Sequence, residues 1–332
     1  MEQVKVQRQT VVLYHRGCND GMVAAWAAWK KFGPSSDSNP VVYLPYQYGE
    51  EFPEVCFGAH VIMVDLSLKV EQLSEAFMQF ESLLVIDHHK SAEPLLEHMA
   101  SVLTYDEYIR TRAVKPLTIY FNRDYSGAVL SYAFFSNLQE IVLDELPLAI
   151  QMIHDYDTWQ FKLENTKAIN IWFINRVQTL QEVDDFIDIG PTFAWVEIGR
   201  TLIRYDERIA RGVIKQYTRS HVMPDGSRVA FVNGPHHLRN EISDQLLKSG
   251  DFDVAVVFTH RKERSVFSLR SNPGFNVAEI AETFGGGGHE QAAAYSIPLA
   301  PINVDNPLEP RRKTFRQRLS AAWKVLKGEA LA

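Results

Sequence analysis

Acids and histidines occur in four groups in the first half of the sequence, each at or just after the end of an apolar segment. The groups are His15 with Asp20, then Asp65, then Asp87 with His88 and His89, and finally Asp155 with Asp157. A buried strand that ends at an acid or an imidazole needs something to offset the free energy of burying that group, and a shared cation can do so. Carboxylate and imidazole ligands without a thiolate favour Mn²⁺ or Mg²⁺, and also accept Zn²⁺ or Co²⁺. The sequence therefore predicts a metal cluster suited to two-ion hydrolysis of a phosphoester.

A second candidate site lies near the C-terminus, where four consecutive glycines precede His289. Glycines let backbone N–H groups approach an anion, and we expect a helix of small residues to follow and to add favourable potential at its N-terminus. Upstream, Arg270 could pair with a phosphate through two N–H groups. The predicted substrate-binding residues are Arg270, Ser271, Gly286, Gly287, Gly288 and His289.

Short apolar segments alternate with helical ones before the metal-capable residues. The expected strands are residues 10–14, 41–44, 60–64 and 82–86, and the expected helices are residues 22–31 and 70–80. Strands that are apolar throughout, with helices between them, predict a parallel sheet covered on both faces. Ligands of such sheets bind outside the carboxyl ends of the strands, which is where the candidate ligands stand.

The rest of the chain predicts a helical region and then a second strand-rich unit. Residues 126–163 and 178–219 have helical patterns, and the second unit has expected strands at 229–232, 254–258 and 266–269 and a helix at 276–284. We predict an α/β protein with a catalytic domain at 8–197, a connecting helix at 198–224, a smaller α/β domain at 225–300 and a basic tail at 301–332 with an amphipathic helix near 315–326. The active site is expected in the cleft between the two domains.

The composition of the chain disfavours several classes of protein. The 332 residues carry 34 Lys and Arg against 41 Asp and Glu, a net charge of −7, which disfavours binding of long duplex nucleic acid by bulk electrostatics. No apolar run reaches the length of a membrane span, and the two cysteines, Cys18 and Cys56, form no metal or redox motif, which predicts a cytoplasmic protein with free thiols. The basic tail is expected to be a solvated surface or a dimer contact, with binding of nucleic acid as the alternative, and the chain is predicted to be a monomer or a homodimer.

The Asp87-His88-His89 motif, with His15, Asp20 and Asp65 upstream, resembles the DHH phosphoesterase superfamily. The pair Arg270-Ser271 and the run from Gly285 to His289 resemble the GGGH form of that family's C-terminal substrate-binding domain. The resemblance extends over residues 10–300. Family members include oligoribonucleases that degrade very short RNA, cyclic-dinucleotide and phosphoadenosine phosphatases, single-strand-specific exonucleases and, in a sister branch, inorganic pyrophosphatases and exopolyphosphatases.

The resemblance implies a role for each motif residue. His15 and Asp20 would hold one Mn²⁺, Asp65 would bridge, and His88 with Asp155 or Asp157 would hold a second Mn²⁺, with Mg²⁺ or Co²⁺ as substitutes. By the same resemblance, His89 would contact the scissile phosphate and Asp87 would orient the histidines. Arg270 and His289 would bind the far phosphate or nucleotide.

One position departs from the family pattern. The first motif usually has two aspartates one residue apart, whereas here Met22 stands where the second is expected if Asp20 is the first. A thioether binds Mn²⁺ poorly, so one ion is expected to be weakly held unless Asn19 contributes.

The predicted activity is metal-dependent hydrolysis of a short single-stranded RNA or DNA, a cyclic dinucleotide or a phosphoadenosine phosphate. A base could stack on an aromatic side chain, for which the candidates are Tyr125, Trp159, Phe161 and Trp172. Two alternatives are a hydrolase of polyphosphate, which has no base to stack, and a nucleotide-binding module with weak catalysis.

Overall fold

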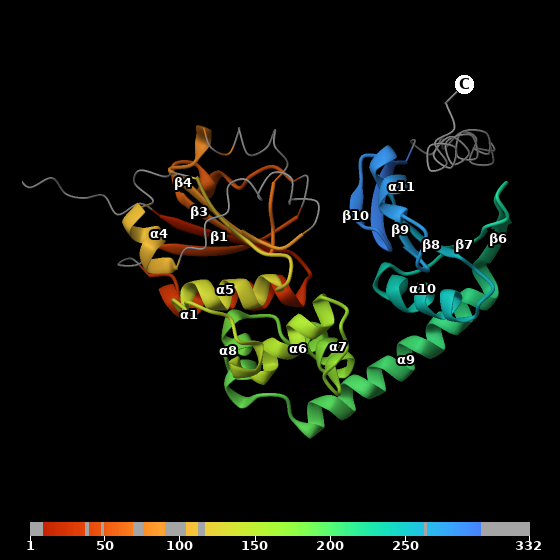
Figure 1. Ribbon diagram of the computed structural model, residues 1–332, viewed down its shortest axis with the longest axis horizontal. Coiled ribbons are helices and arrows are strands. Elements are labelled where there is room, and N and C mark those ends of the chain that lie inside the picture. The colour runs from red at the N-terminus through yellow and green to blue at the C-terminus, as the bar shows by residue number, and fades with distance from the viewer. Residues whose placement is uncertain are drawn as a thin grey trace, which may run out of the picture. The chain divides into compact units, whose positions relative to one another are not determined.

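The computed structural model describes residues 9–36, 40–47, 50–68, 76, 78–89, 104–111, 117–261 and 264–299. The chain divides into two units, residues 1–203 and residues 204–332, which we describe separately (Figure 1). The basic tail and its expected helix lie outside the described residues, as does most of the helix expected at 70–80.

The first unit contains a parallel sheet of five strands in the order β2-β1-β3-β4-β5. Four of the strands are those expected from the sequence, and the fifth, β5, was not expected. Their bounds are β1 (Thr10–His15), β2 (Val41–Tyr46), β3 (His60–Val64), β4 (Ser82–Asp87) and β5 (Leu117–Phe121). Because all five strands run in the same direction, their carboxyl ends meet at one edge of the sheet.

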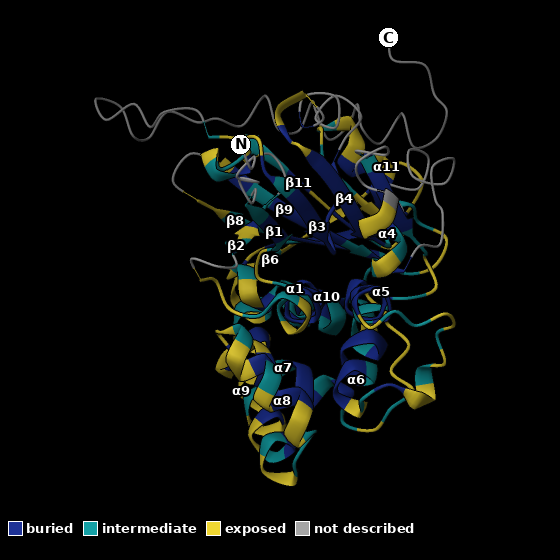
Figure 2. Ribbon diagram, turned by 90° about the vertical axis from the view of Figure 1, so that its left-hand side faces the viewer, coloured by how far each residue is buried: buried dark blue, intermediate teal, exposed yellow. Residues whose placement is uncertain are grey.

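Side chains of each strand point alternately to the two faces of this sheet, and both faces are buried. In β1, Val12 faces one hydrophobic cluster, whereas Val11 and Leu13 face another. The first face is covered by α1 (Asn19–Phe32) and α5 (Gly127–Phe135), which lie side by side and are largely buried (Figures 1 and 2). The strands are therefore apolar at every position because neither face meets water, which confirms the predicted doubly covered parallel sheet.

Further helices extend the core beneath α1 and α5 (Figure 1). They are α6 (Leu148–Asp157), α7 (Thr166–Arg176) and α8 (Leu180–Ile189). The short helix α4 (Tyr105–Thr111) lies above α1 in the same view, and short 3-10 turns occur at Glu54–Cys56 and Leu143–Glu145. Trp172 of α7 stacks on Trp195 at 4.2 Å between ring centroids and is 7% exposed. Trp172 is therefore a core residue and not an exposed surface for a base.

The long helix α9 (Phe193–Tyr217) connects the two units, and the division between them falls within it, after Ile203. Gly190, with φ at 74°, ends α8 and separates it from α9, so the helical region expected at 178–219 is two helices. The expected connecting helix at 198–224 is also too long, because residues 218–222 form a strand, β6, that pairs with β7. The domain limits at 197/198 and 224/225 stay predictions.

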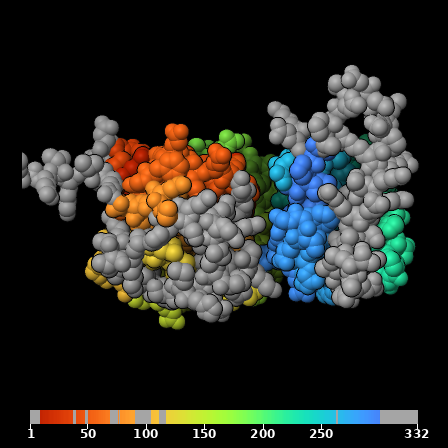
Figure 3. Space-filling view, turned by 90° about the horizontal axis from the view of Figure 1, so that it is seen from above, coloured from red at the N-terminus to blue at the C-terminus, as the bar shows by residue number. Residues whose placement is uncertain are grey.

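The second unit is a mixed sheet of six strands in the order β10-β11-β9-β8-β7-β6, in which β7 and β8 are parallel and the other pairs are antiparallel. Two helices pack against it, with Val277 of one and Ile242 of the other in separate hydrophobic clusters. The elements are β6 (Thr218–Val222), β7 (Arg228–Asn233), a 3-10 turn at His236–Leu238, α10 (Arg239–Lys248), β8 (Val254–His260), β9 (Arg264–Ser271), α11 (Val277–Thr283), β10 (Gly287–His289) and β11 (Ala292–Pro298). Figure 3 shows the C-terminal strands at the surface of this unit in blue.

The prediction of a helix after the glycine run is wrong. Residues 287–289 and 292–298 form the antiparallel pair of strands β10 and β11 instead. A Cβ at Gly286 would lie 2.1 Å from the carbonyl oxygen of Ala294, and one at Gly288 would lie 2.5 Å from that of Ala292. Glycine is needed here because β11 approaches the run closely, so no helix N-terminus faces an anion at this position.

Helices among the described residues are all too short or too polar to span a bilayer.

Candidate metal centre

The metal-capable residues of the first unit meet at the carboxyl edge of its parallel sheet. His15 ends β1, Asp65 follows β3, and Asp87 ends β4 and is followed by His88 and His89. The two other contributors come from helices at the same edge: Asp20 from the first turn of α1 and Asp157 from the last turn of α6. The parallel topology thus brings together residues that are up to 142 positions apart in the sequence.

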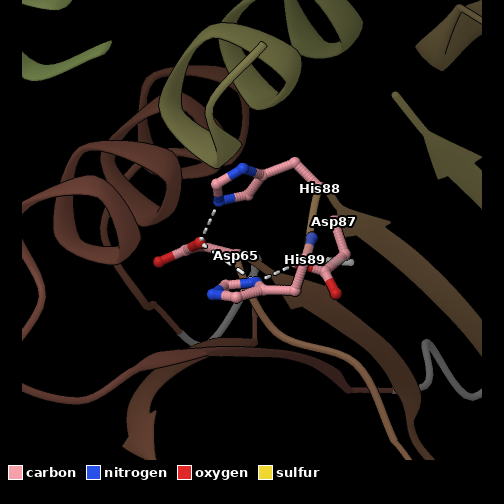
Figure 4. Close-up of side chains that lie close together, drawn as sticks. All are labelled: Asp65, Asp87, His88 and His89. Carbon is pink, nitrogen blue, oxygen red and sulfur yellow. Dashed lines mark hydrogen bonds and ion pairs between the residues drawn. The ribbon is translucent and has the colours of Figure 1, made fainter. Parts of the chain in front are cut away.

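Asp65 is the centre of this group (Figure 4). Its Oδ1 lies 3.2 Å from Nε2 of His88 and 3.9 Å from Nδ1 of His89, whereas its Oδ2 lies 3.6 Å from Nδ1 of His15. The residue is 1% exposed and has a φ of 54°, a left-handed conformation that few non-glycine residues adopt. Backbone strain of this kind is typically found at functional sites.

Two more carboxylates face His88. Its Nε2 lies 3.4 Å from Oδ2 of Asp157 and 3.8 Å from Oδ2 of Asp20. The other oxygen of Asp20 accepts a hydrogen bond from the backbone N–H of Ala128, at 3.0 Å. Asp20 is therefore fixed by the start of α5 and is grouped with His88 and Asp157 rather than with His15.

Asp87 and His89 form a separate pair within the site. Nδ1 of His89 lies 2.7 Å from Oδ1 of Asp87, which is fully buried (Figure 4). The same oxygen accepts a weaker hydrogen bond from the His89 backbone N–H, at 3.4 Å. Asp87 thus fixes the orientation of the His89 ring.

The histidines of this cluster lower the pKa values of Asp65 and Asp87, against the effect of burial, but the pKa values of Asp20 and Asp157 stay raised. Burial, with the added negative charge of Asp65 and Asp157, raises the pKa of Asp20 well above its usual value. The pKa of His88 is raised to about 10, because the hydrogen bond to Asp65 and the charge of Asp157 outweigh the opposing effect of burial. Asp20, Asp65 and Asp87 each have one buried carboxylate oxygen that accepts no hydrogen bond from the described part of the chain. Oxygens left in this state fit divalent cations, which would satisfy them and reduce the repulsion between the acids.

Ligand atoms fall into three groups whose members lie within 4.8 Å of one another. The groups are Asp65, Asp87, His88 and His89; Asp20, His88 and Asp157; and His15, Cys18 and Asp65. Asp65 belongs to two of them, so its two oxygens face two neighbouring positions for an ion. The sequence analysis interpreted Cys18 as a free thiol outside any metal motif. Its thiol is partly buried, and its pKa is raised well above its usual value by burial and by the charge of Asp65.

Asp155 points elsewhere, although it is only two residues from Asp157. Its carboxylate accepts hydrogen bonds from the backbone N–H groups of Lys162 and Leu163, at 2.8 and 3.0 Å, and from the Thr166 hydroxyl, at 2.6 Å. Three donors occupy this carboxylate, so of the two candidates only Asp157 faces His88. Asp155 instead fixes the loop between α6 and α7.

Asn19, the alternative ligand that the sequence left open, does not face the cluster. Its amide nitrogen donates to the backbone and side-chain oxygens of Asn170, both at 3.0 Å. Met22 packs against the hydrophobic core on this side of the sheet.

Gly127 is a site residue that the sequence analysis missed. A Cβ at this position would lie 2.6 Å from Cβ of Asp65 and 2.8 Å from Oδ2 of Asp20. The first turn of α5 can therefore approach the two acids only if residue 127 has no side chain. A glycine before an apolar helix is a weak signal in the sequence alone, since it resembles any loop glycine.

We expect Gly127→Ala to reduce the affinity for divalent metal at least about tenfold and to lower the free energy of unfolding by about 1–3 kcal/mol, because the added methyl group must displace Asp65 or Asp20. Calorimetric metal titration and chemical unfolding would measure both effects. Gly212→Ala is the matched control, since a Cβ there meets nothing within 4 Å and the residue lies within α9. Equal metal affinity in the two variants would contradict the prediction.

His154 fixes the start of α5, the helix on which Gly127 lies. Its Nδ1 accepts a hydrogen bond from the backbone N–H of Ser126, at 3.1 Å, and it is 4% exposed. Burial, with a smaller contribution from the positive charges of His88 and Lys162, lowers its pKa to about 4, although Asp155 acts in the opposite direction. The ring is therefore neutral in the folded protein at neutral pH.

This shift predicts a loss of stability on acidification. The unfolded chain protonates His154 near its ordinary pKa of about 6.5 and the folded chain only near 4, so stability decreases as the pH falls through this interval. Neutral His154 therefore contributes about 3 kcal/mol to the free energy of unfolding at neutral pH. In His154→Asn, which keeps an acceptor for Ser126, unfolding free energies measured from pH 7 to pH 4 should depend less steeply on pH. An unchanged slope would contradict the assignment.

The predicted substrate-binding residues belong to the second unit. The guanidinium of Arg270, which is partly buried, donates to Oδ1 of Asn240 and to the carbonyl oxygen of Leu269, both at 2.8 Å. The hydroxyl of Ser271 donates to the carbonyl oxygen of Phe275, and His289 is exposed on β10. Gly286, Gly287 and Gly288 lie at the start of the β10–β11 pair. Arg270 pairs with Ala292 across β9 and β11, and Ala292 pairs with His289 across β11 and β10, so Arg270 and His289 are aligned across three neighbouring strands.

Comparisons with known proteins agree with this architecture. Residues 237–320 match the DHHA1 domain family. Over 303 residues the chain is 26% identical to the uncharacterized protein R106 of Acanthamoeba polyphaga mimivirus, an alignment that covers 86% of this chain and 67% of the relative.

Two solved structures share the fold over nearly the whole chain. A DHH-domain protein described as a member of a family of ribosomal proteins has a TM-score of 0.57 and 14% identity, and the match covers 97% of this chain and 88% of that one. Exonuclease RecJ bound to manganese has a TM-score of 0.51 and 15% identity, and the match covers 96% of this chain and 90% of that one.

Proposed function

Since the chain belongs to the DHH phosphoesterase superfamily, as its DHHA1 domain and its fold indicate, we propose that it hydrolyses phosphoester bonds of short nucleotides with the help of two divalent ions, Mn²⁺ foremost. The observation that carries the proposal is the position of Asp65, whose two buried oxygens face two groups of metal-capable side chains. Such an arrangement suits a ligand that bridges two ions.

The residues divide between the two ion positions. Asp20, His88 and Asp157 would hold one ion, and His15 would hold the other, with Asp65 between them. Ions bound there would stabilise negative charge on both the attacking and the leaving oxygen of a phosphoester. We assign His89 to the contact with the scissile phosphate, because Asp87 fixes its ring beside Asp65.

Two exposed aromatic residues favour a nucleotide over polyphosphate. Trp159 and Phe161, which follow directly after α6 and Asp157, are 58% and 44% exposed and contact each other edge to face at 5.5 Å. Both have positive φ angles, 57° and 49°, so the backbone holds them in an unusual conformation. Trp159 lies at most about 8 Å in Cα distance from Asp157. An exposed ring so near the cluster can stack a base of a bound nucleotide.

We expect Trp159→Ala to raise KM for an RNA dinucleotide about tenfold or more, because the loss of one stacked base costs about 1–3 kcal/mol. Hydrolysis of a phosphoester without a base should change little. Phe193→Ala is the control, since Phe193 is 79% exposed and begins α9. Equal KM values for Trp159→Ala and wild type would contradict the role in stacking.

The activity is tested with metal-stripped protein to which Mn²⁺ is returned. The substrates are a labelled RNA dinucleotide, a longer single-stranded RNA, a cyclic dinucleotide, phosphoadenosine phosphate and polyphosphate, with an RNA duplex to test its expected exclusion. Mn²⁺-dependent cleavage of any short nucleotide supports the proposal. Cleavage of polyphosphate alone, or binding of a nucleotide without turnover, would contradict it and favour one of the two alternatives.

From the sequence we propose a cytoplasmic location for the protein. Both cysteines are free in the structure, as expected in a reducing cytoplasm. We propose a monomer or homodimer, which light scattering at several concentrations would distinguish.

A further inference from the structure

Cys18 lies beside the cluster, and the proposed mechanism gives it no role. It stands between His15 and Asp20 at the N-cap position of α1, where Ser, Thr, Asp and Asn are the preferred residues. Gly17, with φ at 70°, turns the chain between His15 and Cys18 in a conformation that disfavours other residues. This turn returns the thiol to the imidazole that ends β1.

Among the described residues, the ion position next to His15 lacks a third acid or histidine. The structure groups Asp20 with His88 and Asp157, and Met22, where a second acid was expected, packs into the core. Among the described acids and histidines, His15 and one oxygen of Asp65 are then left for this ion. A position with two protein ligands binds an ion weakly, since zinc sites in proteins have at least three.

The Sγ of Cys18 lies where the missing ligand would be. It is within 4.8 Å of ligand atoms of both His15 and Asp65. Tetrahedral ligands at about 2.0–2.3 Å from an ion are about 3.5 Å apart, so these side chains need to approach one another by at most about 1.3 Å. Asp65 is 1% exposed, and its Oδ2, which lies 3.6 Å from Nδ1 of His15, accepts no hydrogen bond within 3.5 Å from the described residues. This buried oxygen is the second observation that points to an ion at this position.

We propose that Cys18 is a metal ligand that completes, with His15 and Asp65, the ion position at the end of β1. The proposal rests on the proposed function only in that both require a metal cluster at this edge. A thiolate ligand favours Zn²⁺ or Co²⁺ over Mn²⁺ and Mg²⁺, whereas the position formed by Asp20, His88 and Asp157 has only oxygen and nitrogen donors and suits Mn²⁺. The two positions therefore differ in metal preference. An ion that binds the thiol displaces its proton to solvent.

Cys56 offers a matched control within the same unit. It is fully buried in the hydrophobic cluster on the other face of the sheet, with Val61 and Leu66. Among the described residues, it belongs to none of the three groups of metal-capable side chains. Its thiol is thus a core group, and Cys56→Ala removes a thiol without removing a ligand.

The first test is spectroscopic and does not depend on turnover. Metal-stripped wild-type protein loaded with one equivalent of Zn²⁺ should show a sulfur neighbour at about 2.3 Å in X-ray absorption at the zinc edge. Loaded with Co²⁺, it should show a sulfur-to-metal charge-transfer band in the near ultraviolet. Both signals should persist in Cys56→Ala and vanish in Cys18→Ser. Zinc bound to the wild type with only oxygen and nitrogen neighbours would overturn the proposal even if the variant failed to fold.

A second test measures metal preference by competition. In Cys18→Ser, the ratio of Zn²⁺ to Mn²⁺ affinity should fall at least about tenfold relative to wild type, because even loss of a group that only supports a ligand costs about 10–100-fold in affinity. An unchanged ratio would overturn the proposal.

The two proposals can fail separately. A sulfur-bound ion in a protein that hydrolyses no phosphoester would contradict the proposed function and leave Cys18 a ligand. Mn²⁺-dependent hydrolysis in a protein whose ions have no sulfur neighbour would support the proposed function and contradict the assignment of Cys18 as a ligand. Absence of any metal binding would contradict both.

Discussion

Asp65→Asn is expected to reduce kcat for phosphoester hydrolysis by about a thousandfold or more. The substitution removes the charge that faces both ion positions, since Oδ1 lies toward His88 and Oδ2 toward His15. Stabilisation of the transition state by bound ions is worth several kcal/mol, and each 1.36 kcal/mol is a factor of about ten in rate. Metal content measured on the same samples should fall below that of wild type.

The control for this prediction is an acid that plays no part in the cluster. Asp124 lies in an exposed turn, and Asp124→Asn changes the same charge outside the site. Circular dichroism establishes that both variants are folded. An Asp65→Asn protein with the turnover and metal content of wild type would contradict the central assignment of the site.

Asp157→Asn and Asp155→Asn should have opposite effects, although the two residues are on the same turn of α6. Asp157 faces His88 at 3.4 Å, so we expect its variant to lose about a hundredfold or more in kcat with little loss of stability. Burial and the nearby charge of Asp65 already raise the pKa of Asp157, so neutralising this residue relieves repulsion in the metal-free protein.

Asp155→Asn should instead destabilise the fold. The three donors to its carboxylate include two backbone N–H groups, and hydrogen bonds to a charged acceptor are worth about 1.5–3 kcal/mol each. We expect a decrease of about 2–4 kcal/mol in the free energy of unfolding, with kcat per folded molecule within about tenfold of wild type. Chemical unfolding and steady-state kinetics on both variants measure the difference. The reverse pattern would mean that Asp155 is the ligand.

Much of this fold is encoded in local patterns of the sequence. The strands at residues 10–15, 41–46, 60–64 and 82–87 are apolar at nearly every position because both faces of the sheet are buried, and this pattern is visible without any structure. The order of strands and helices then places the ends of β1, β3 and β4 at one edge. The grouping of His15, Asp65 and His88 could therefore be predicted from the sequence.

Segments whose conformation depends on pairing with a neighbouring strand could not be predicted from local sequence patterns. Residues 290–294 carry no local signal against a helix, yet Ala292 to Ala294 pair with β9, because an extended chain there satisfies the backbone hydrogen bonds of a neighbouring strand. The segment at 218–222 likewise continued a helical pattern until its pairing with β7 determined its conformation.

The sequence by itself determined which acids and histidines stand at the strand ends and the edge of the sheet at which they meet, because parallel strands end at the same place whatever surrounds them. Only the tertiary structure decided which side-chain atoms face one another in the cluster. Asp155 and Asp157 are equivalent in the sequence, but the loop at 162–166 provides donors for one and leaves the other facing His88. Gly127 and Cys18 became site residues only because α5 and the turn before α1 approach Asp65 closely. Such approaches depend on distances between elements far apart in the sequence, which local patterns of residues do not specify.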